Sequence, residues 1–153
     1  MIDDLYSARV LALAANMPRA GRLAQPDASA ERTSKLCGSR ILVDLVVRDG
    51  RVVDFAQEVK ACALGQASAA ILGEHVLGAT LEEIEMARDR LSAMLRADGP
   101  PPGGRFEDLA VLQPVKDFPA RHASTMLAFE AAAAAAREAV EREASRTSPA
   151  VAG

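Results

Sequence analysis

Two cysteines are the residues of this chain best suited to metal or sulfur chemistry. Cys37 and Cys62 are its 2 thiols, and they flank a segment that is typical of a β-hairpin, with strands over 39–47 and 52–60 around an Asp-Gly turn. A hairpin brings residues equally distant from its turn side by side. We therefore expect the two Cα atoms within roughly 5–8 Å of each other at one end of the sheet.

Two hairpin registers are compatible with this turn. A two-residue loop places Cys37 opposite Cys62, but it sets the apolar side of the first strand against a mostly polar set in the second. A three-residue loop, Arg48-Asp49-Gly50 with glycine at positive φ, instead aligns Leu45 with Val53. We favour the three-residue loop because it pairs apolar residues with apolar residues.

The chemistry of the site follows from where helices begin. Cys62 opens a predicted helix, and free backbone N–H groups at a helix N-terminus stabilise a thiolate. In a compact fold, the start of the last helix brings Arg121, His122 and Ser124 to the same zone. Two thiolates and an imidazole suit a tetrahedral zinc site that lacks one ligand, which water or a partner's thiolate supplies. The alternative stays open that both cysteines are packed thiols without chemistry, because free cysteine behaves as a small hydrophobe.

The expected elements make up an α+β fold. A small antiparallel sheet of two or three strands is packed on one face by several α-helices. One domain is expected over 1–144, and 145–153 form a disordered tail. The other expected elements are a helix over 2–15, a loop or weak edge strand over 22–36, a helix over 62–77 whose small residues allow close approach to the sheet, a helix from a Thr80/Glu83 capping box to Arg96, a Pro/Gly loop over 98–104, a short helix over 106–112 and an alanine-rich helix over 120–144.

Composition narrows the function classes. Half of the 153 residues are apolar, which is enough for one core. The net charge of −3 and the lack of a basic face argue against nucleic acid. No segment approaches the roughly 20 apolar residues that cross a bilayer, and the first residues do not form a signal peptide. A cytoplasmic protein is expected, in which the two cysteines are reduced thiols or metal ligands.

In chain order, these segments resemble the U-type iron–sulfur cluster scaffold family, which comprises NifU N-terminal domains, IscU and SufU. The resemblance runs from about Leu5 to Ala131. It is carried by the turn 16–21, Cys37-Gly38, Cys62 before the small-residue run 67–70, Gly78-Ala79-Thr80-Leu81-Glu82-Glu83, Leu112-Gln113-Pro114-Val115-Lys116 and, closer to the SufU branch, Phe118-Pro119-Ala120-Arg121.

The resemblance implies a scaffold or carrier of an iron–sulfur cluster, of the [2Fe–2S] type, or of zinc. Its partners would be a cysteine desulfurase and a chaperone that binds Leu112, Pro114, Val115 and Lys116. The ligands that two cysteines leave missing would come from His122, from a second copy of the chain in a cluster-bridged homodimer, from glutathione or from a partner. Three cysteines and one aspartate are the ligands in the family. Here Ser39 stands at the aspartate position and Ser124 at the third cysteine.

Only Cys37 and Cys62 therefore carry over as ligands, since a hydroxyl is a poor ligand for soft iron or zinc. His122 and Ser124 complete the candidate metal set, and Gly38, Ser39 and Arg121 lie next to it. His75 is expected to be a partly exposed surface residue.

Three functions are consistent with this reading. A scaffold or carrier, and not an enzyme, is favoured. The second is a SufU-like, zinc-dependent sulfurtransferase in which Cys62 accepts persulfide sulfur from a cysteine desulfurase. The third is a ligand-poor homologue without a cofactor, which acts as a binding or regulatory module.

Overall fold

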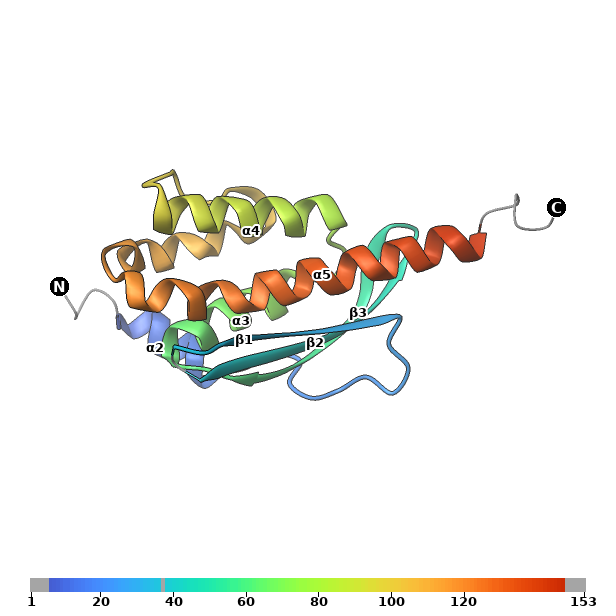
Figure 1. The fold of residues 1–153 in the computed structure, drawn as a ribbon, viewed down its shortest axis with the longest axis horizontal. Helices are drawn as coiled ribbons and strands as arrows, with labels where there is room; N and C mark the ends of the chain where they lie inside the picture. Colours follow the sequence, from blue (N-terminus) through green and yellow to red (C-terminus); the bar gives the residue numbers. More distant parts are fainter. Residues whose placement is uncertain (1–5, 37, 148–153) are drawn as a thin grey trace.

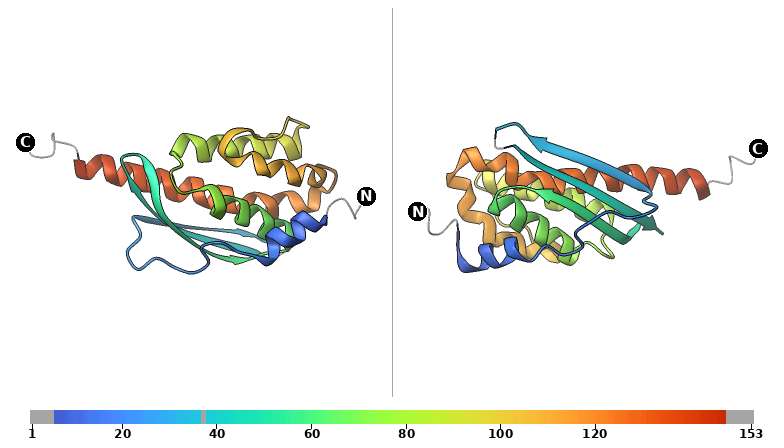
Figure 2. Two further views of the ribbon diagram at one scale, coloured as in Figure 1. Left: turned by 180° about the vertical axis from the view of Figure 1, so that it is seen from behind. Right: turned by 90° about the horizontal axis from the view of Figure 1, so that it is seen from below.

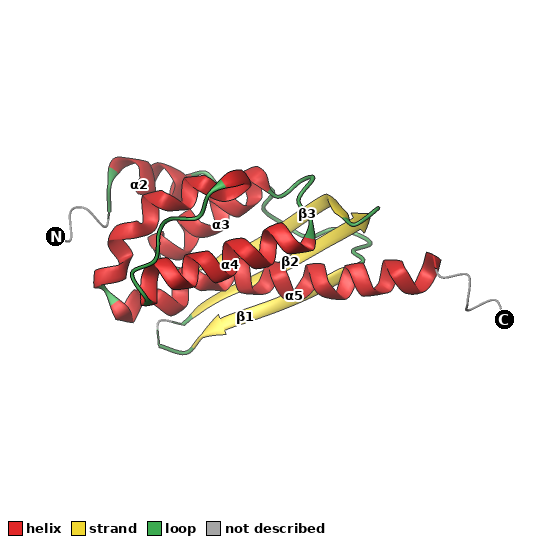
Figure 3. Ribbon diagram, turned by 90° about the horizontal axis from the view of Figure 1, so that it is seen from above, coloured by secondary structure: helices red, strands yellow, loops and turns green. Residues whose placement is uncertain are grey.

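A three-stranded antiparallel sheet forms one layer of the molecule, and helices cover one of its faces (Figures 1 and 3). The fold is a computed structural model that describes residues 6–36 and 38–147. The strands lie in the order β1 (Ala28–Ser34), β2 (Ser39–Arg48) and β3 (Arg51–Lys60). The α+β prediction is confirmed, and the stretch expected to be a loop or weak edge strand contains the edge strand β1.

The helices form two further layers on the sheet. Helices α3 and α5 lie against the strands, and α4 packs on α5 on the side away from the sheet (Figure 1). The helical elements are α2 (Ala8–Ala15), α3 (Ala63–His75), α4 (Leu81–Arg96), the 3₁₀ helices η1 (Gly104–Asp117) and η2 (Pro119–Arg121), and α5 (His122–Thr147). No helix among the described residues is long and apolar enough to span a bilayer.

Local sequence signals account for several boundaries. The Thr80 hydroxyl accepts from Glu83 N at 3.1 Å, and the Glu83 carboxylate accepts from Thr80 N at 3.0 Å, so the predicted capping box is confirmed. The helix expected over 106–112 is part of the longer η1. Helix α5 continues to Thr147, past its predicted end at Ala144, and the rest of the predicted disordered tail, 148–153, lies outside the described residues.

The favoured hairpin register is wrong. The turn is the two-residue loop Asp49-Gly50, with φ of 53° and 75°, because Arg48 pairs with Arg51. A β-bulge then inserts Val53, so that Leu45 pairs with Phe55 and both side chains face the helices. The bulge therefore pairs an apolar residue with an apolar residue, which was the reason for favouring the three-residue loop.

The core lies between the sheet and α3 and α5. The apolar face of β2, with Ile41, Val43, Leu45 and Val47, is buried against α5. Alanines on α5 are small enough to let this helix lie close to both the strands and α4. Phe129 of α5 meets Phe106 of η1 edge to face, with ring centroids 5.2 Å apart, which ties η1 to the core.

The opposite face of β2 carries one fully buried charge, Asp44. Figure 2 shows the segment between α2 and β1 on this side of the sheet. From this segment Arg22 donates to both carboxylate oxygens of Asp44, at 2.6 and 3.1 Å, and Leu23 N donates at 3.1 Å, while Ser29 of β1 adds its hydroxyl. Burial raises the pKa of Asp44, but the hydrogen bonds from Arg22, Ser29 and Leu23 outweigh it and leave the pKa below its usual range.

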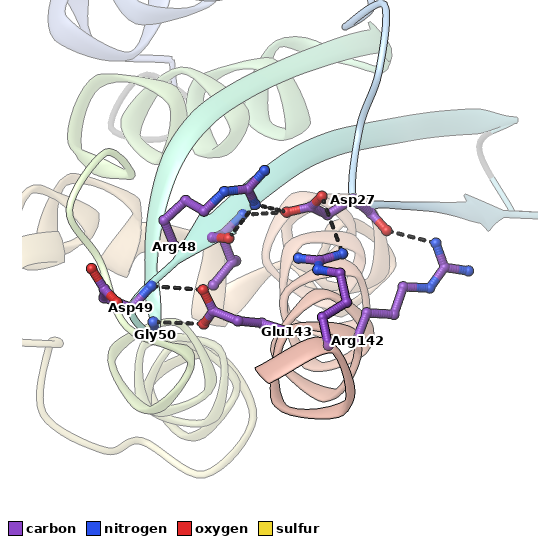
Figure 4. A network of polar contacts seen from close by, with 8 residues as sticks. Asp27, Arg48, Asp49, Gly50, Arg142 and Glu143 are labelled. Atoms are coloured by element: carbon purple, nitrogen blue, oxygen red, sulfur yellow. Dashed lines mark hydrogen bonds and ion pairs between the residues drawn. The ribbon is translucent and has the colours of Figure 1, made fainter. Parts of the chain in front are cut away.

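The last turns of α5 hold the closed end of the hairpin (Figure 4). The Glu143 carboxylate accepts from the backbone N–H of Asp49 at 2.7 Å and of Gly50 at 2.9 Å. Beside it, Asp27 accepts from Val47 N at 2.9 Å and from Arg48 at 2.7 Å. Partial burial raises the pKa of Asp27, but these hydrogen bonds outweigh it and lower the pKa overall.

We expect Glu143→Gln to lower the free energy of unfolding by about 1 kcal/mol, because one carboxylate oxygen that accepts a backbone N–H becomes an amide donor. Urea unfolding followed by circular dichroism measures the change. Glu141→Gln, at an exposed position of the same helix, is the matched control and should leave the unfolding midpoint unchanged. Equal midpoints for the two variants would contradict a stabilising role of this contact.

Candidate functional site

Cys62 lies where β3 ends and α3 begins. It is the N-cap residue of α3, with φ −66° and ψ 171°, and its carbonyl accepts the first helical hydrogen bond from Gln66 N at 2.9 Å. The predicted position at a helix N-terminus is confirmed. The half-buried thiol opens onto a surface depression of about 370 Å³, which is lined by Gly38, Ser39, Val59, Lys60, Ala61, Cys62 and Gln66.

Two buried serines connect Cys62 to the strand and helix around it. Ser124, in the first turn of α5, places its Oγ 3.3 Å from Cys62 Sγ and 3.1 Å from the Oγ of Ser39, the first residue of β2. Ser124 is 0% exposed and Ser39 is 3% exposed. The structure therefore brings together three of the predicted site residues, in the chain of contacts Cys62–Ser124–Ser39.

A glycine makes this arrangement possible. A Cβ added to Gly65 of α3 would lie 2.9 Å from Ser124 Oγ, 3.1 Å from Ser124 O and 2.8 Å from the Cβ of Ala61. The first turns of α3 and α5 can approach each other this closely only because position 65 has no side chain. The small residues of α3 were expected to allow approach to the sheet, whereas Gly65 serves the contact with α5.

Cys37 lies outside the described residues, so its predicted proximity to Cys62 stays a prediction. The next residue, Gly38, has φ +69° and its N–H donates to Ser34 O at 2.8 Å, which closes the turn between β1 and β2. Gly38 also lines the depression beside Cys62. The residue that follows Cys37 in the chain therefore lies at the same depression as Cys62.

His122 is engaged away from the thiol. Its Nε2 donates to Val115 O at 2.9 Å and lies 3.2 Å from Lys116 O, and the residue is 8% exposed. This hydrogen bond holds the end of η1 against the start of α5. Arg121, predicted next to the site, ends η2, and its carbonyl accepts from the Thr125 hydroxyl at 2.8 Å.

The segment predicted to bind a chaperone is only partly accessible. Leu112 and Val115 are core residues, 0% and 1% exposed, while Pro114 and Lys116 are half-buried. Lys116 pairs with Asp98 at 3.0 Å, and this hydrogen bond raises the pKa of the lysine. A partner that docks on the native fold would meet Pro114 and Lys116, and would reach Leu112 and Val115 only if η1 moved.

Within residues 6–36 and 38–147, one group of three side chains could hold a metal ion, and it consists of Glu74, His75 and Asp108. This group lies at the C-terminal end of α3, whereas Cys62 lies at its N-terminus. His75 Nε2 lies 2.9 Å from Asp108 and 3.8 Å from Glu74. Arg9 pairs with the other oxygen of Asp108 at 3.2 Å. His75, at the end of α3, is 35% exposed, as expected of a surface residue. Asp108 of η1 joins α3 through the contact with His75 and α2 through the ion pair with Arg9.

Sequence reasoning missed three residues of the site. Lys60 and Gln66 line the depression, and Gly65 sets the distance between α3 and α5. Gln66 could have been predicted, because it follows the N-cap cysteine by one helical turn and residues four apart share a helix face. Nothing local to Gly65 indicates that its neighbour is Ser124.

Comparisons with known proteins agree with this fold. The sequence model of the family described as "NifU-like N terminal domain" matches residues 5–144. The iron-sulfur cluster assembly scaffold protein IscU of Thermotoga maritima is 29% identical over 126 residues, which cover 82% of this chain and 88% of that protein.

Solved structures are similar over most of their length. The crystal structure of a nitrogen-fixing NifU-like protein (N-terminal) from Brucella abortus is 53% identical, with a TM-score of 0.90 over 92% of this chain and 98% of that one. The structure of SufU from Fervidobacterium islandicum AW-1 is 19% identical, with a TM-score of 0.80 over 88% of this chain and 98% of that one, and shows the fold alone. The chain thus belongs to the family of NifU-like N-terminal domains, the U-type iron–sulfur cluster assembly scaffolds that its motifs resembled.

Proposed function

We propose that this protein is a scaffold or carrier in iron–sulfur cluster assembly, which binds its cluster through the thiolates of Cys37 and Cys62. The observation that carries the proposal is the position of Cys62. Its sulfur lies at a helix N-terminus and on an open depression reached by Gly38. A thiolate is the ligand that iron–sulfur clusters take, and the free N–H groups of a first helical turn stabilise it. Membership of the scaffold family supports this reading.

One copy of the chain supplies too few ligands for a cluster. It contains 2 cysteines, while a [2Fe–2S] cluster is held by four thiolates. Ser39 and Ser124 are hydrogen-bonded to each other and are hard, neutral donors, so they do not replace the missing thiolates. The Nε2–H of His122 donates to Val115 O, which leaves only Nδ1 as a metal ligand, and even with that nitrogen one copy of the chain has three ligands. We therefore infer that a second copy of the chain contributes its two cysteines and that the cluster bridges a homodimer.

Anaerobic reconstitution with ferrous iron and sulfide tests this function. The expected result is a coloured protein with visible absorbance, about two irons and two sulfides per dimer, and the size of a dimer in gel filtration. Cys62→Ala should abolish all three signals. Ser68→Ala is the matched control, because Ser68 lies buried on the same helix and its hydroxyl has no hydrogen-bond partner among the described residues. A colourless wild type, or a Cys62→Ala variant that still binds the cluster, would refute the proposal.

The accessibility of Cys62 favours a second function, as a sulfur acceptor for a cysteine desulfurase. The Cys62 thiolate would attack the terminal sulfur of a persulfide on the desulfurase. The S–S bond of that persulfide breaks, a persulfide forms on Cys62, and the desulfurase cysteine leaves as a thiolate. Mass spectrometry should find a sulfur atom added to Cys62 after incubation with a desulfurase and cysteine. If the mass of Cys62 stays unchanged in that experiment, this second function is excluded.

A further inference from the structure

The Ser124 hydroxyl lies between a half-buried thiol and a second, buried hydroxyl. Its Oγ is 3.3 Å from Cys62 Sγ and 3.1 Å from Ser39 Oγ. Gly65 closes the remaining side, because a single added carbon there would lie 2.9 Å from Ser124 Oγ. The hydroxyl is therefore held in one place by three elements of the fold.

The chemistry of the three groups fixes the direction of the hydrogen bonds. A serine hydroxyl has one proton to donate, and a thiolate or metal-bound sulfur can only accept. When the sulfur of Cys62 is a thiolate or is bound to a metal, it carries no proton, so Ser124 has to donate its proton to Sγ. The Ser39 hydroxyl then donates to Ser124 Oγ, which keeps the Ser124 proton directed at the sulfur. When Cys62 carries its own proton, the same chain can run in the opposite direction.

We propose that Ser124 is a positioning residue for Cys62, which donates a hydrogen bond to its sulfur and is itself held by Ser39, and that it is not a ligand. This role rests on the proposed function of Cys62 and assigns Ser124 a part in it. The charge-assisted O–H···S bond stabilises the anionic sulfur that binds metal or attacks a persulfide. As a ligand, Ser124 would have to turn a lone pair instead of its proton toward the metal, and a neutral hydroxyl is a poor ligand for iron or zinc.

Alkylation of metal-free protein by iodoacetamide tests the proposal. All measurements use a Cys37→Ala background, in which Cys62 is the remaining thiol. Ser124→Ala should slow alkylation at pH 7 by about three- to tenfold. The reason is that a hydrogen bond to a charged group changes the thiolate population by more than about tenfold, and the higher nucleophilicity of the less stabilised thiolate offsets roughly half of that effect.

Two further variants make the test specific. Ser39→Ala, which removes the group that holds Ser124, should slow alkylation less than Ser124→Ala does. Ser68→Ala deletes a buried hydroxyl of α3 that has no partner in the part of the chain that the structure describes, and should react like the background protein. At pH 10, well above the usual thiol pKa of about 8.5, the hydrogen bond should change the thiolate population little, and Ser124→Ala should react as fast as the background or slightly faster.

The possible outcomes are distinct. Slower alkylation at pH 7 together with an equal or faster rate at pH 10 supports the positioning role. Equal rates at pH 7, or the same slowing at both pH values, overturn it, because the second result reports a change of access. The alkylation experiment contains no iron, so its result is independent of whether a cluster can be reconstituted. Equal alkylation rates at pH 7 would overturn the role of Ser124 even if the protein binds a cluster.

Discussion

Replacing Gly65 by valine is expected to lower the free energy of unfolding by about 3 kcal/mol, near the upper end of the usual cost of overpacking. The first added carbon alone would lie 2.8 Å from Ala61 Cβ and 2.9 Å from Ser124 Oγ. A third contact, at 3.1 Å, is with the backbone oxygen of Ser124, which cannot rotate away. Helix α3 must therefore move away from α5, and Cys62 at its N-terminus moves with it.

Urea unfolding measures this loss, and reconstitution with iron and sulfide should show reduced cluster binding in the same variant. Gly103→Val is the matched control. Gly103 has extended backbone, with φ −110°, and nothing lies within 4 Å of an added Cβ. We expect the control to unfold within about 0.5 kcal/mol of wild type. A Gly65→Val variant as stable as the control would show that the contact between α3 and α5 tolerates a side chain.

The second large effect is expected at the buried carboxylate of Asp44. Asp44→Asn should lower the free energy of unfolding at pH 7 by about 2–4 kcal/mol, because the amide directs a donor at groups that are themselves donors and leaves a buried network unsatisfied. Arg22, Leu23 and Ser29 all donate to this carboxylate. Asp89→Asn, in an exposed ion pair with Arg88, is the control and should change stability by no more than about 0.5 kcal/mol.

The effect of Asp44 should depend on pH in a defined direction. The folded protein lowers the pKa of Asp44 below its usual range, so the unfolded chain takes up a proton at higher pH than the folded one. The stabilising contribution is then complete above the unfolded pKa of about 3.9 and is lost as the pH falls through the folded value. Urea unfolding at pH 7, 4 and 3 should show the difference between wild type and Asp44→Asn becoming smaller. A difference that stays constant over this range would contradict the assignment.

Local patterns in the sequence were sufficient for the elements but not for their register. The capping box at Thr80, the Asp-Gly turn and the cysteine before a small-residue helix were each read from a few neighbouring residues. The predicted register was wrong because either a longer loop or a β-bulge can shift the pairing of a hairpin by one residue, and the sequence does not show which of them is present. In the structure the bulge leaves two consecutive residues of β3 exposed, Val53 and Asp54, and the apolar side chain of Val53 gave no sign of this in the sequence.

Three of the predicted site residues lie together in the structure, but the contacts between them were not predicted, and their role stays a prediction. Cys62, Ser39 and Ser124 were identified from chain order and family motifs, and the structure joins them by hydrogen bonds. His122 was expected beside the thiols, yet its ring reaches the end of η1. The direction of a side chain at a helix start depends on which segment packs there, and that segment lies outside the motif.

Helix α5 contacts both ends of the hairpin, so the length of the helix and the length of the strands must match. Its first turn meets the open end of β2 through Ser124 and Ser39, and its last turns meet the closed end through Glu143 and Gly50. From Ser124 to Glu143 the helix rises about 28 Å, close to the roughly 30 Å between the first and last residues of the ten-residue strand β2. Lengthening the strands by a pair of residues would carry one end out of reach, so the strands can change length only if the helix gains or loses about a turn with them.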